Sequence, residues 1–238
     1  MVEPLIPLIP LLPFLGFLFY VAGGAFSSWL GKGVRLPDSS AYVGVALMGV
    51  SWLLSLFVAG TVLLGPGETI YRAYPWLVIG GVNISVGYMV DGLTAVMLIV
   101  VSTVAFAVQV YSLGYMHGDE KKPRFFSHLS LFTAAMLALV LSNTLLELFI
   151  SWEIMGLASY LLIGYWFEKP SAMRAAKKAF IVTRVGDTFF FLGILLLVMH
   201  TGTTDFADVV LGTGDPSTRM ALDGSDARIT GGHLLFAK

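Results

Sequence analysis

Hydrophobic residues along the chain gather in blocks of about twenty, and short polar segments separate these blocks. A block of that length spans the ~30 Å hydrocarbon core of a bilayer as a helix. The pattern therefore predicts an all-α polytopic membrane protein with about six complete transmembrane helices and the start of a seventh. The predicted spans are 14–31, 41–64, 93–116, 125–142, 144–167 and 179–199, with the first turns of a seventh at 231–238.

Two helix boundaries are predicted from proline positions and from the length that one helix can have in a bilayer. Prolines stand at 4, 7, 10 and 13, and proline lacks the N–H that a helix interior uses, so the first helix is predicted to begin near Pro13. The apolar run 125–167 would measure ~65 Å as one helix, roughly twice the core thickness. A turn is therefore placed at Ser142 and Asn143.

The segment between the second and third spans changes its period. A bulky apolar run at 76–79 precedes Gly80 and Gly81, and apolar residues then alternate with small or polar ones from Val82 to Tyr88. Period-two alternation after a glycine pair favours a small β-hairpin at the outer surface. So short an alternating pattern is about equally compatible with an irregular loop that lies on the bilayer interface.

Basic residues are distributed unequally between the two sets of connecting loops. Loops 1–2, 3–4 and 5–6 carry nine Lys and Arg, whereas the N-terminus and the other loops carry three. Cytoplasmic loops are the ones enriched in Lys and Arg. The N-terminus is therefore predicted to lie outside the cytoplasm.

Composition narrows the possible functions. Hydrophobic residues make up 57% of the chain and charged residues 12%, with a net charge of −1, so no basic surface is expected for nucleic acid. The sequence contains no cysteine, which excludes thiolate metal sites and cysteine-ligated iron–sulfur clusters on this chain. No metal ligand set and no glycine-rich nucleotide motif is found, so redox chemistry is expected on other chains.

Four charged residues lie inside the predicted spans, namely Glu147, Glu153, Arg184 and Asp187. An ionisable group at helix-centre depth costs about 2.5 kcal/mol or more, so it usually has a partner and often a function. Glu153 stands close to mid-membrane and is predicted to be a protonatable carboxyl that a nearby cation controls. The alternative is a fixed ion pair between the fifth and sixth spans. Glu147, near the end of its span, is expected to be structural or solvated.

Arg184 and Asp187 are three residues apart and therefore share one helix face. Either they neutralise each other and serve only insertion, or Arg184 modulates Glu153 while Asp187 holds or releases it. Lys177 and Lys178 are placed at the cytoplasmic mouth of the sixth span, where lysines commonly set topology. Lys178 is included as a fourth candidate residue of a proton-transfer relay.

Two long sequence runs resemble a known family. The runs 151–167 and 175–187, together with Tyr115, Met116, Gly118 and Asp119 upstream, resemble subunit L of the proton-pumping NADH-quinone oxidoreductase, respiratory complex I. This subunit belongs to an antiporter-like family shared with multisubunit cation/proton antiporters. The resemblance covers nearly the whole chain.

The resemblance implies a bundle of about fourteen transmembrane helices with two inverted repeats. Residues 1–124 would supply the first three helices, and 125–238 an incomplete first repeat, so the chain is expected to be the N-terminal part of a longer protein. By resemblance, Glu153 takes part in proton transfer, and Arg184 and Asp187 match the family's pair on the sixth helix. The chain would be a non-redox subunit, with NADH, FMN, iron–sulfur clusters and quinone on other subunits. Its expected partners are those membrane subunits and the lipid bilayer.

Two other functions are compatible with the same residues. The chain could belong to a multisubunit cation/proton antiporter, or it could be a non-transporting truncated assembly fragment. A carboxylate beside a cation suits several coupled ions, so proton, sodium and potassium all stay open.

Overall fold

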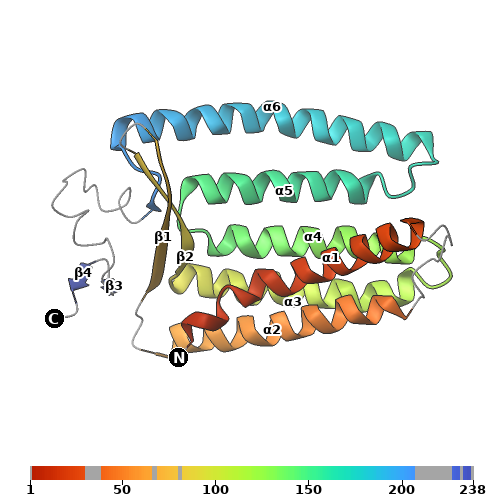
Figure 1. Ribbon diagram of the computed structural model, residues 1–238, viewed down its shortest axis with the longest axis horizontal. Helices are drawn as coiled ribbons and strands as arrows, with labels where there is room; N and C mark the ends of the chain where they lie inside the picture. The colour runs from red at the N-terminus through yellow and green to blue at the C-terminus, as the bar shows by residue number, and fades with distance from the viewer. Residues whose placement is uncertain are drawn as a thin grey trace.

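The computed structural model describes residues 2–29, 39–65, 69–79, 82–206, 227–230 and 233–236. Six helices in it are long and apolar enough to cross a membrane, which confirms the predicted number of spans. They lie side by side along the long dimension of the molecule (Figure 1). The helices are α1 (Leu8–Trp29), α2 (Ser40–Leu64), α3 (Gly92–Tyr115), α4 (Lys122–Leu141), α5 (Leu145–Ile163) and α6 (Pro170–Thr201).

Helix α4 is the centre of the bundle. It packs against α1, α2, α3 and α5, whereas α6 packs against α5 at the edge (Figure 1). Small and hydroxyl side chains let neighbouring helices approach closely in a membrane. The buried side of α4 carries several of them, including Ser127, Ser130, Thr133, Ala134 and Ala135. The predicted division of the chain at residue 124 falls within the first turn of this helix and stays a prediction.

Helix α1 begins at Leu8, preceded by a 3-10 turn at Glu3–Leu5, so the predicted start near Pro13 is wrong. The physical reason is that another helix replaces the donor that Pro13 lacks. The carbonyl of Ile9, which a residue at position 13 would normally bond, accepts a hydrogen bond of 2.7 Å from the Ser51 hydroxyl on α2. The helix can therefore continue through the proline.

The carbonyls opposite the two earlier prolines also have donors, mainly backbone N–H groups three residues further on. The carbonyl of Ile6, opposite Pro10, accepts from the Ile9 N–H at 3.1 Å. The carbonyl of Glu3, opposite Pro7, accepts from the Ile6 N–H at 3.2 Å and from the Tyr88 hydroxyl at 3.3 Å. Burial raises the pKa of Tyr88, which keeps this phenol a donor. Each carbonyl that a proline leaves open thus has a donor, as a bilayer requires.

The connection between α5 and α6 also differs from the prediction. Helix α5 ends at Ile163 rather than 167, and α6 begins at Pro170, nine residues before the predicted start at 179. Proline is favoured in the first helical turn, and the Ala and Lys residues that follow it are good helix formers. The basic residues assigned to a loop are therefore the first turns of a helix of 32 residues, about 48 Å long.

A β-hairpin joins α2 to α3, which confirms the hairpin alternative. Strand β1 (Ile70–Ile79) pairs antiparallel with β2 (Val82–Val90), and the register shifts between Pro75 and Leu77. Such a bulge suits a residue that cannot donate to the ladder. Gly87 permits the close pairing, because a Cβ there would lie 1.9 Å from the Arg72 carbonyl oxygen.

Residues 233–236 form strand β4 (His233–Phe236), which pairs with β3 (Ala227–Thr230). The predicted start of a seventh helix is therefore wrong for these four residues, and the rest of that prediction, 231–232 and 237–238, lies outside the described residues. Antiparallel pairing satisfies the backbone N–H and C=O groups that face each other across the two strands.

The connections gather at the two ends of the bundle (Figure 1). At one end, Arg72 of β1 pairs with Glu3 at 2.8 Å, and the Leu145 N–H bonds the Thr204 carbonyl at 2.8 Å. At the other end, Lys121 pairs with Glu168, and the Tyr165 hydroxyl donates to Asp119 at 3.0 Å. This alternation agrees with the predicted loop sets, and the side that faces the cytoplasm stays a prediction.

Candidate functional site

Three predicted site residues meet between the middles of α5 and α6. Arg184 makes an ion pair with the Glu153 carboxylate through Nη1, and its Nη2 donates to the Glu153 carbonyl at 3.3 Å. Its Nε lies 3.9 Å from Asp187 Oδ2. The side chains of Glu153, Arg184 and Asp187 are 23%, 30% and 11% exposed, so the cluster is largely removed from the surface.

Local sequence explains why the guanidinium fits at this position. The i, i+3 spacing turns Arg184 and Asp187 toward α5 together. On α5, Gly156 lies opposite: a Cβ there would stand 3.2 Å from Arg184 Nη2. On α6, the Phe180 ring lies one turn earlier with its centroid 4.7 Å from the Arg184 guanidinium carbon, a cation–π contact. The absence of a side chain at Gly156 and the ring of Phe180 thus form a slot that holds the Arg184 guanidinium.

Asp187 has a second partner that the sequence analysis missed. The Trp152 indole N–H donates to Asp187 Oδ1 at 2.9 Å. The bond fixes one carboxylate oxygen and leaves Oδ2 toward Arg184. A signal was present in the sequence, because a tryptophan within an apolar helix usually finds an acceptor for its N–H. Nothing in the sequence showed which acceptor it would be.

The cluster has one cation between two acids. A guanidinium carries five N–H donors, and Arg184 Nε has no hydrogen-bond partner in the described part of the chain. A shift of about 1 Å would bring Nε within hydrogen-bond distance of Asp187. A small side-chain movement would therefore bring the cation into direct contact with its second acidic neighbour.

Lys178 lies apart from this cluster. It is exposed on α6, six residues before Arg184, which places it about 120° around the helix from Arg184. Within the described ranges, no ion pair is formed by Lys178 or by the exposed Lys177. The role of Lys178 in a relay stays a prediction without a contact to support it.

Glu147 holds the hairpin against the start of α5. Its carboxylate accepts from the Gly87 N–H at 3.0 Å and from the Asn143 N–H at 3.2 Å. The N-terminal turn of α5 is capped by Thr144, whose hydroxyl accepts from the Glu147 N–H at 3.2 Å. These bonds agree with the structural role expected for Glu147.

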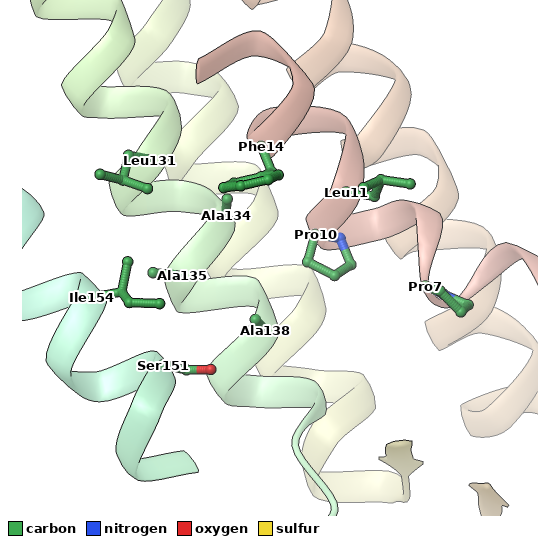
Figure 2. Close-up of a pocket in the computed structure, with 10 residues that line it drawn as sticks. All are labelled: Pro7, Pro10, Leu11, Phe14, Leu131, Ala134, Ala135, Ala138, Ser151 and Ile154. Atoms are coloured by element: carbon green, nitrogen blue, oxygen red, sulfur yellow. The ribbon is translucent and has the colours of Figure 1, made fainter. Parts of the chain in front are cut away.

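A cavity of about 270 Å³ lies between α1, α4 and α5 (Figure 2). It is lined by Pro7, Pro10, Leu11, Phe14, Leu131, Ala134, Ala135, Ala138, Ser151 and Ile154. None of these side chains is ionisable. Ile154 borders the cavity, whereas its neighbour Glu153 pairs with α6, so the cavity and the charged cluster are separate sites. Among the described residues, no group of three His, Asp or Glu side chains could hold a metal ion, and we assign none.

The fold and the cluster define a multi-pass membrane protein with an acid–base–acid group between two adjacent helices. Comparison with family models places the chain more narrowly. Residues 76–126 match the N-terminus of chain 5 of NADH-ubiquinone oxidoreductase (complex I), and residues 142–237 match the transmembrane domain of the NADH:quinone oxidoreductase/Mrp antiporter family. The chain belongs to this family of antiporter-like membrane subunits, which confirms the resemblance found in the sequence.

Individual proteins with similar sequences support the same family membership. The chain is 50% identical over 141 residues to NADH-quinone oxidoreductase subunit L of Neisseria meningitidis, covering 58% of this chain and 21% of that protein. It is 43% identical to subunit 5 of the Paulinella chromatophora NAD(P)H-quinone oxidoreductase, and the match covers 88% of this chain and 30% of that protein. It is 44% identical to F(420)H(2) dehydrogenase subunit L of Methanosarcina mazei, and the match covers 73% of this chain and 25% of that protein. The chain thus spans less than a third of these relatives' length.

A solved structure shares the fold at lower sequence identity. A chain of the membrane-bound sulfane sulfur reductase, an archaeal respiratory membrane complex, superposes with a TM-score of 0.72 at 17% identity. The match covers 89% of this chain and 41% of the other. At this identity the likeness concerns the fold alone.

Proposed function

We propose that this chain takes part in proton translocation as a membrane subunit of an NADH:quinone oxidoreductase, with Glu153 as the proton-carrying carboxyl. The observation that carries the proposal is that Arg184 is bonded to Glu153 while its unpartnered Nε faces Asp187 at 3.9 Å. Membership of the antiporter-like family supports this assignment.

The proposed step is an exchange of partners. While Arg184 bonds Glu153, the cation compensates the buried carboxylate. When Arg184 moves toward Asp187, Glu153 loses that compensation, and an unpaired carboxylate in an apolar environment is costly. Glu153 then takes up a proton from one side, and the return of Arg184 expels it. Trp152, bonded to Asp187, acts as a positioning residue for the second partner. Lys178 is left out of this relay.

The proposal makes this chain a non-redox subunit. Reduction of quinone by NADH, through FMN and iron–sulfur clusters, would occur on other subunits of the complex and drive the movement of Arg184. The lack of cysteine supports that division of labour. As a subunit of such a complex, the chain would lie in the cell inner (plasma) membrane. The excess of Lys and Arg in alternate loops supports an N-terminus outside the cytoplasm.

The test is the Glu153→Gln substitution in the assembled complex. The amide cannot exchange a proton, so we expect proton translocation per NADH oxidised to fall severalfold while assembly and NADH oxidation persist. Glu147→Gln is the matched control, because it makes the same chemical change on the same helix outside the cluster. Unchanged translocation in Glu153→Gln, or an equal loss in both variants, would refute the proposal.

A second function has one observation in its favour, since the family description that matches residues 142–237 also names Mrp antiporters. In such a complex the same cluster would couple a proton to another cation. Vesicle transport that depends on sodium or potassium, without any NADH oxidation, would identify this alternative. The Glu153 variant would lose transport in both cases, so the ion dependence decides between them.

A further inference from the structure

A row of bulky exposed residues follows one side of α6 at spacings of four or three residues. We call it the α6 stripe, and it comprises Arg174, Lys178, Val182, Val185, Phe189, Leu192 and Leu196. At 100° per residue these positions fall within an arc of about 80°. Its five apolar residues are 49–69% exposed, and both cations are exposed as well. The stripe is therefore open to whatever surrounds the helix.

The stripe is separate from the charged cluster. Arg184 and Asp187 turn toward α5, and helical geometry places them about 120° and 180° from the middle of the stripe. A ligand on the stripe would therefore contact none of the proposed proton-transfer residues.

Charge and length of the stripe match an amphiphile with an anionic head. Arg174 and Lys178 stand one helical turn apart at one end, and in the described part of the chain neither forms an ion pair. No acid lies on the stripe. From Lys178 to Phe189 the helix rises about 16 Å, which is half of the ~30 Å core and so the depth of one leaflet. Two cations above one leaflet of apolar surface suit a phosphate with an acyl chain beneath it.

The nearby connection marks the level of the membrane interface. Trp166 is half-exposed, and Lys169 lies over its ring at 4.5 Å from the centroid. Tryptophan with lysine is typical of the headgroup region. Arg174 lies five residues after Lys169, a rise of about 8 Å along the helix toward its apolar part.

Side-chain size argues against a helix as the occupant. Close crossings between membrane helices are enriched in small residues, and the stripe has none. Small residues lie beside it, at Gly186 and Gly193, where an added Cβ would meet nothing within 4 Å. A polypeptide neighbour would fit that glycine side better than a row of Val, Phe and Leu.

We propose that the α6 stripe binds an anionic phospholipid, with the phosphate held by Arg174 and Lys178 and an acyl chain along Val182, Val185 and Phe189. Basic groups near a membrane surface attract anionic lipids at about 1 kcal/mol each, or roughly fivefold per residue. The site thus combines charge recognition at one end with apolar contact below it.

The first test measures lipid selectivity of the purified complex in phosphatidylcholine vesicles that contain spin-labelled phosphatidylglycerol. We expect Arg174→Gln/Lys178→Gln to lower the preference for phosphatidylglycerol over phosphatidylcholine severalfold. Lys121→Gln/Lys169→Gln is the matched control, because it removes two cations at the same end that instead lie over the Phe167 and Trp166 rings. Equal losses in both variants would mean a diffuse surface charge and overturn the site, as would no loss.

The second test identifies the occupant directly. Benzoylphenylalanine replaces Phe189, which preserves an aromatic side chain, and the assembled complex is irradiated in the same vesicles. A cross-link to phospholipid, reduced by Arg174→Gln/Lys178→Gln, supports the proposal. A cross-link to another polypeptide would overturn it and show a protein interface on this face.

Discussion

Trp152 and Asp187 are joined across the α5–α6 interface by an indole hydrogen bond of 2.9 Å, and the residue that follows Trp152 is Glu153. Two consecutive residues of α5 therefore hold the two acidic sides of one cluster: Trp152 fixes Asp187, and Glu153 pairs with Arg184. A rotation of α5 would change both contacts together. The relative position of the two helices is thus tied to both contacts.

Trp152→Phe removes the donor to Asp187 and keeps an aromatic ring. Losing one partner of a hydrogen-bonded buried carboxylate costs about 1–3 kcal/mol. We expect Asp187 to compete more strongly for Arg184, so proton translocation per NADH oxidised falls while the assembled complex stays intact. Proton uptake by vesicles and subunit content measure the two effects. Normal translocation in this variant would contradict the positioning role of Trp152.

Gly156→Ala tests the space around the guanidinium. The new Cβ would stand 3.2 Å from Arg184 Nη2, so the cation must shift by a few tenths of an ångström. We expect translocation to fall severalfold, with little change in unfolding temperature. Gly60→Ala is the matched control on α2, where an added Cβ meets nothing within 4 Å. Proton translocation should fall in Gly156→Ala and stay normal in the control. Equal translocation in both variants would show that the space beside the Arg184 guanidinium does not limit transport.

Ser51→Ala removes the donor to the Ile9 carbonyl. An unsatisfied buried carbonyl costs about 1–3 kcal/mol, and we expect a lower unfolding temperature of the purified protein in detergent. Ser55→Ala is the control, because Ser55 donates at 2.8 Å to a carbonyl of its own helix, that of Ser51. Thermal unfolding followed by tryptophan fluorescence compares the two. A loss in Ser55→Ala as large as that in Ser51→Ala would rule out the special role of the interhelical bond.

Tyr165 gives a pH dependence at the end of the bundle that carries the α5–α6 connection. Burial, followed by the hydrogen bond to Asp119, raises the pKa of this phenol above its usual value of 10.0. A raised pKa in the folded state means that stability from the neutral phenol is complete below pH 10 and is lost as the pH rises further. Tyr165→Phe should cost about 1 kcal/mol below pH 10 and little at higher pH. Chemical unfolding at several pH values measures the difference, and a constant difference would contradict this account.

The prediction of helices succeeded where the bilayer alone sets the length. The spans predicted at 41–64 and 93–116 differ from α2 and α3 by at most one residue at each end. The start of α1 was mispredicted, because hydrophobicity does not show that Ser51 would supply a donor for the Ile9 carbonyl. The start of α6 was mispredicted because charged residues were read as loop, although Lys and Ala propagate a helix beyond the membrane.

The charged cluster was predicted because a buried charge is too costly to be incidental. That argument identified Glu153, Arg184 and Asp187. Lys178, a further candidate placed at the mouth of the sixth span, lies on another face of α6. Trp152 was missed because its acceptor depends on how α5 and α6 face each other. The cost of burying a charged residue can be inferred from the sequence of one helix. The partner of a side chain can be identified only when the rotation of two neighbouring helices is known.

The bond from Ser51 to Ile9 bears on how the protein is made. During synthesis α1 leaves the ribosome before α2, and until α2 arrives the carbonyl opposite Pro13 has no donor from Ser51. The first segment alone is therefore a poorly bonded helix in lipid. We expect the insertion machinery to release α1 and α2 into the bilayer as a pair. The proline-rich start would then delay commitment of the N-terminus until its neighbour is available.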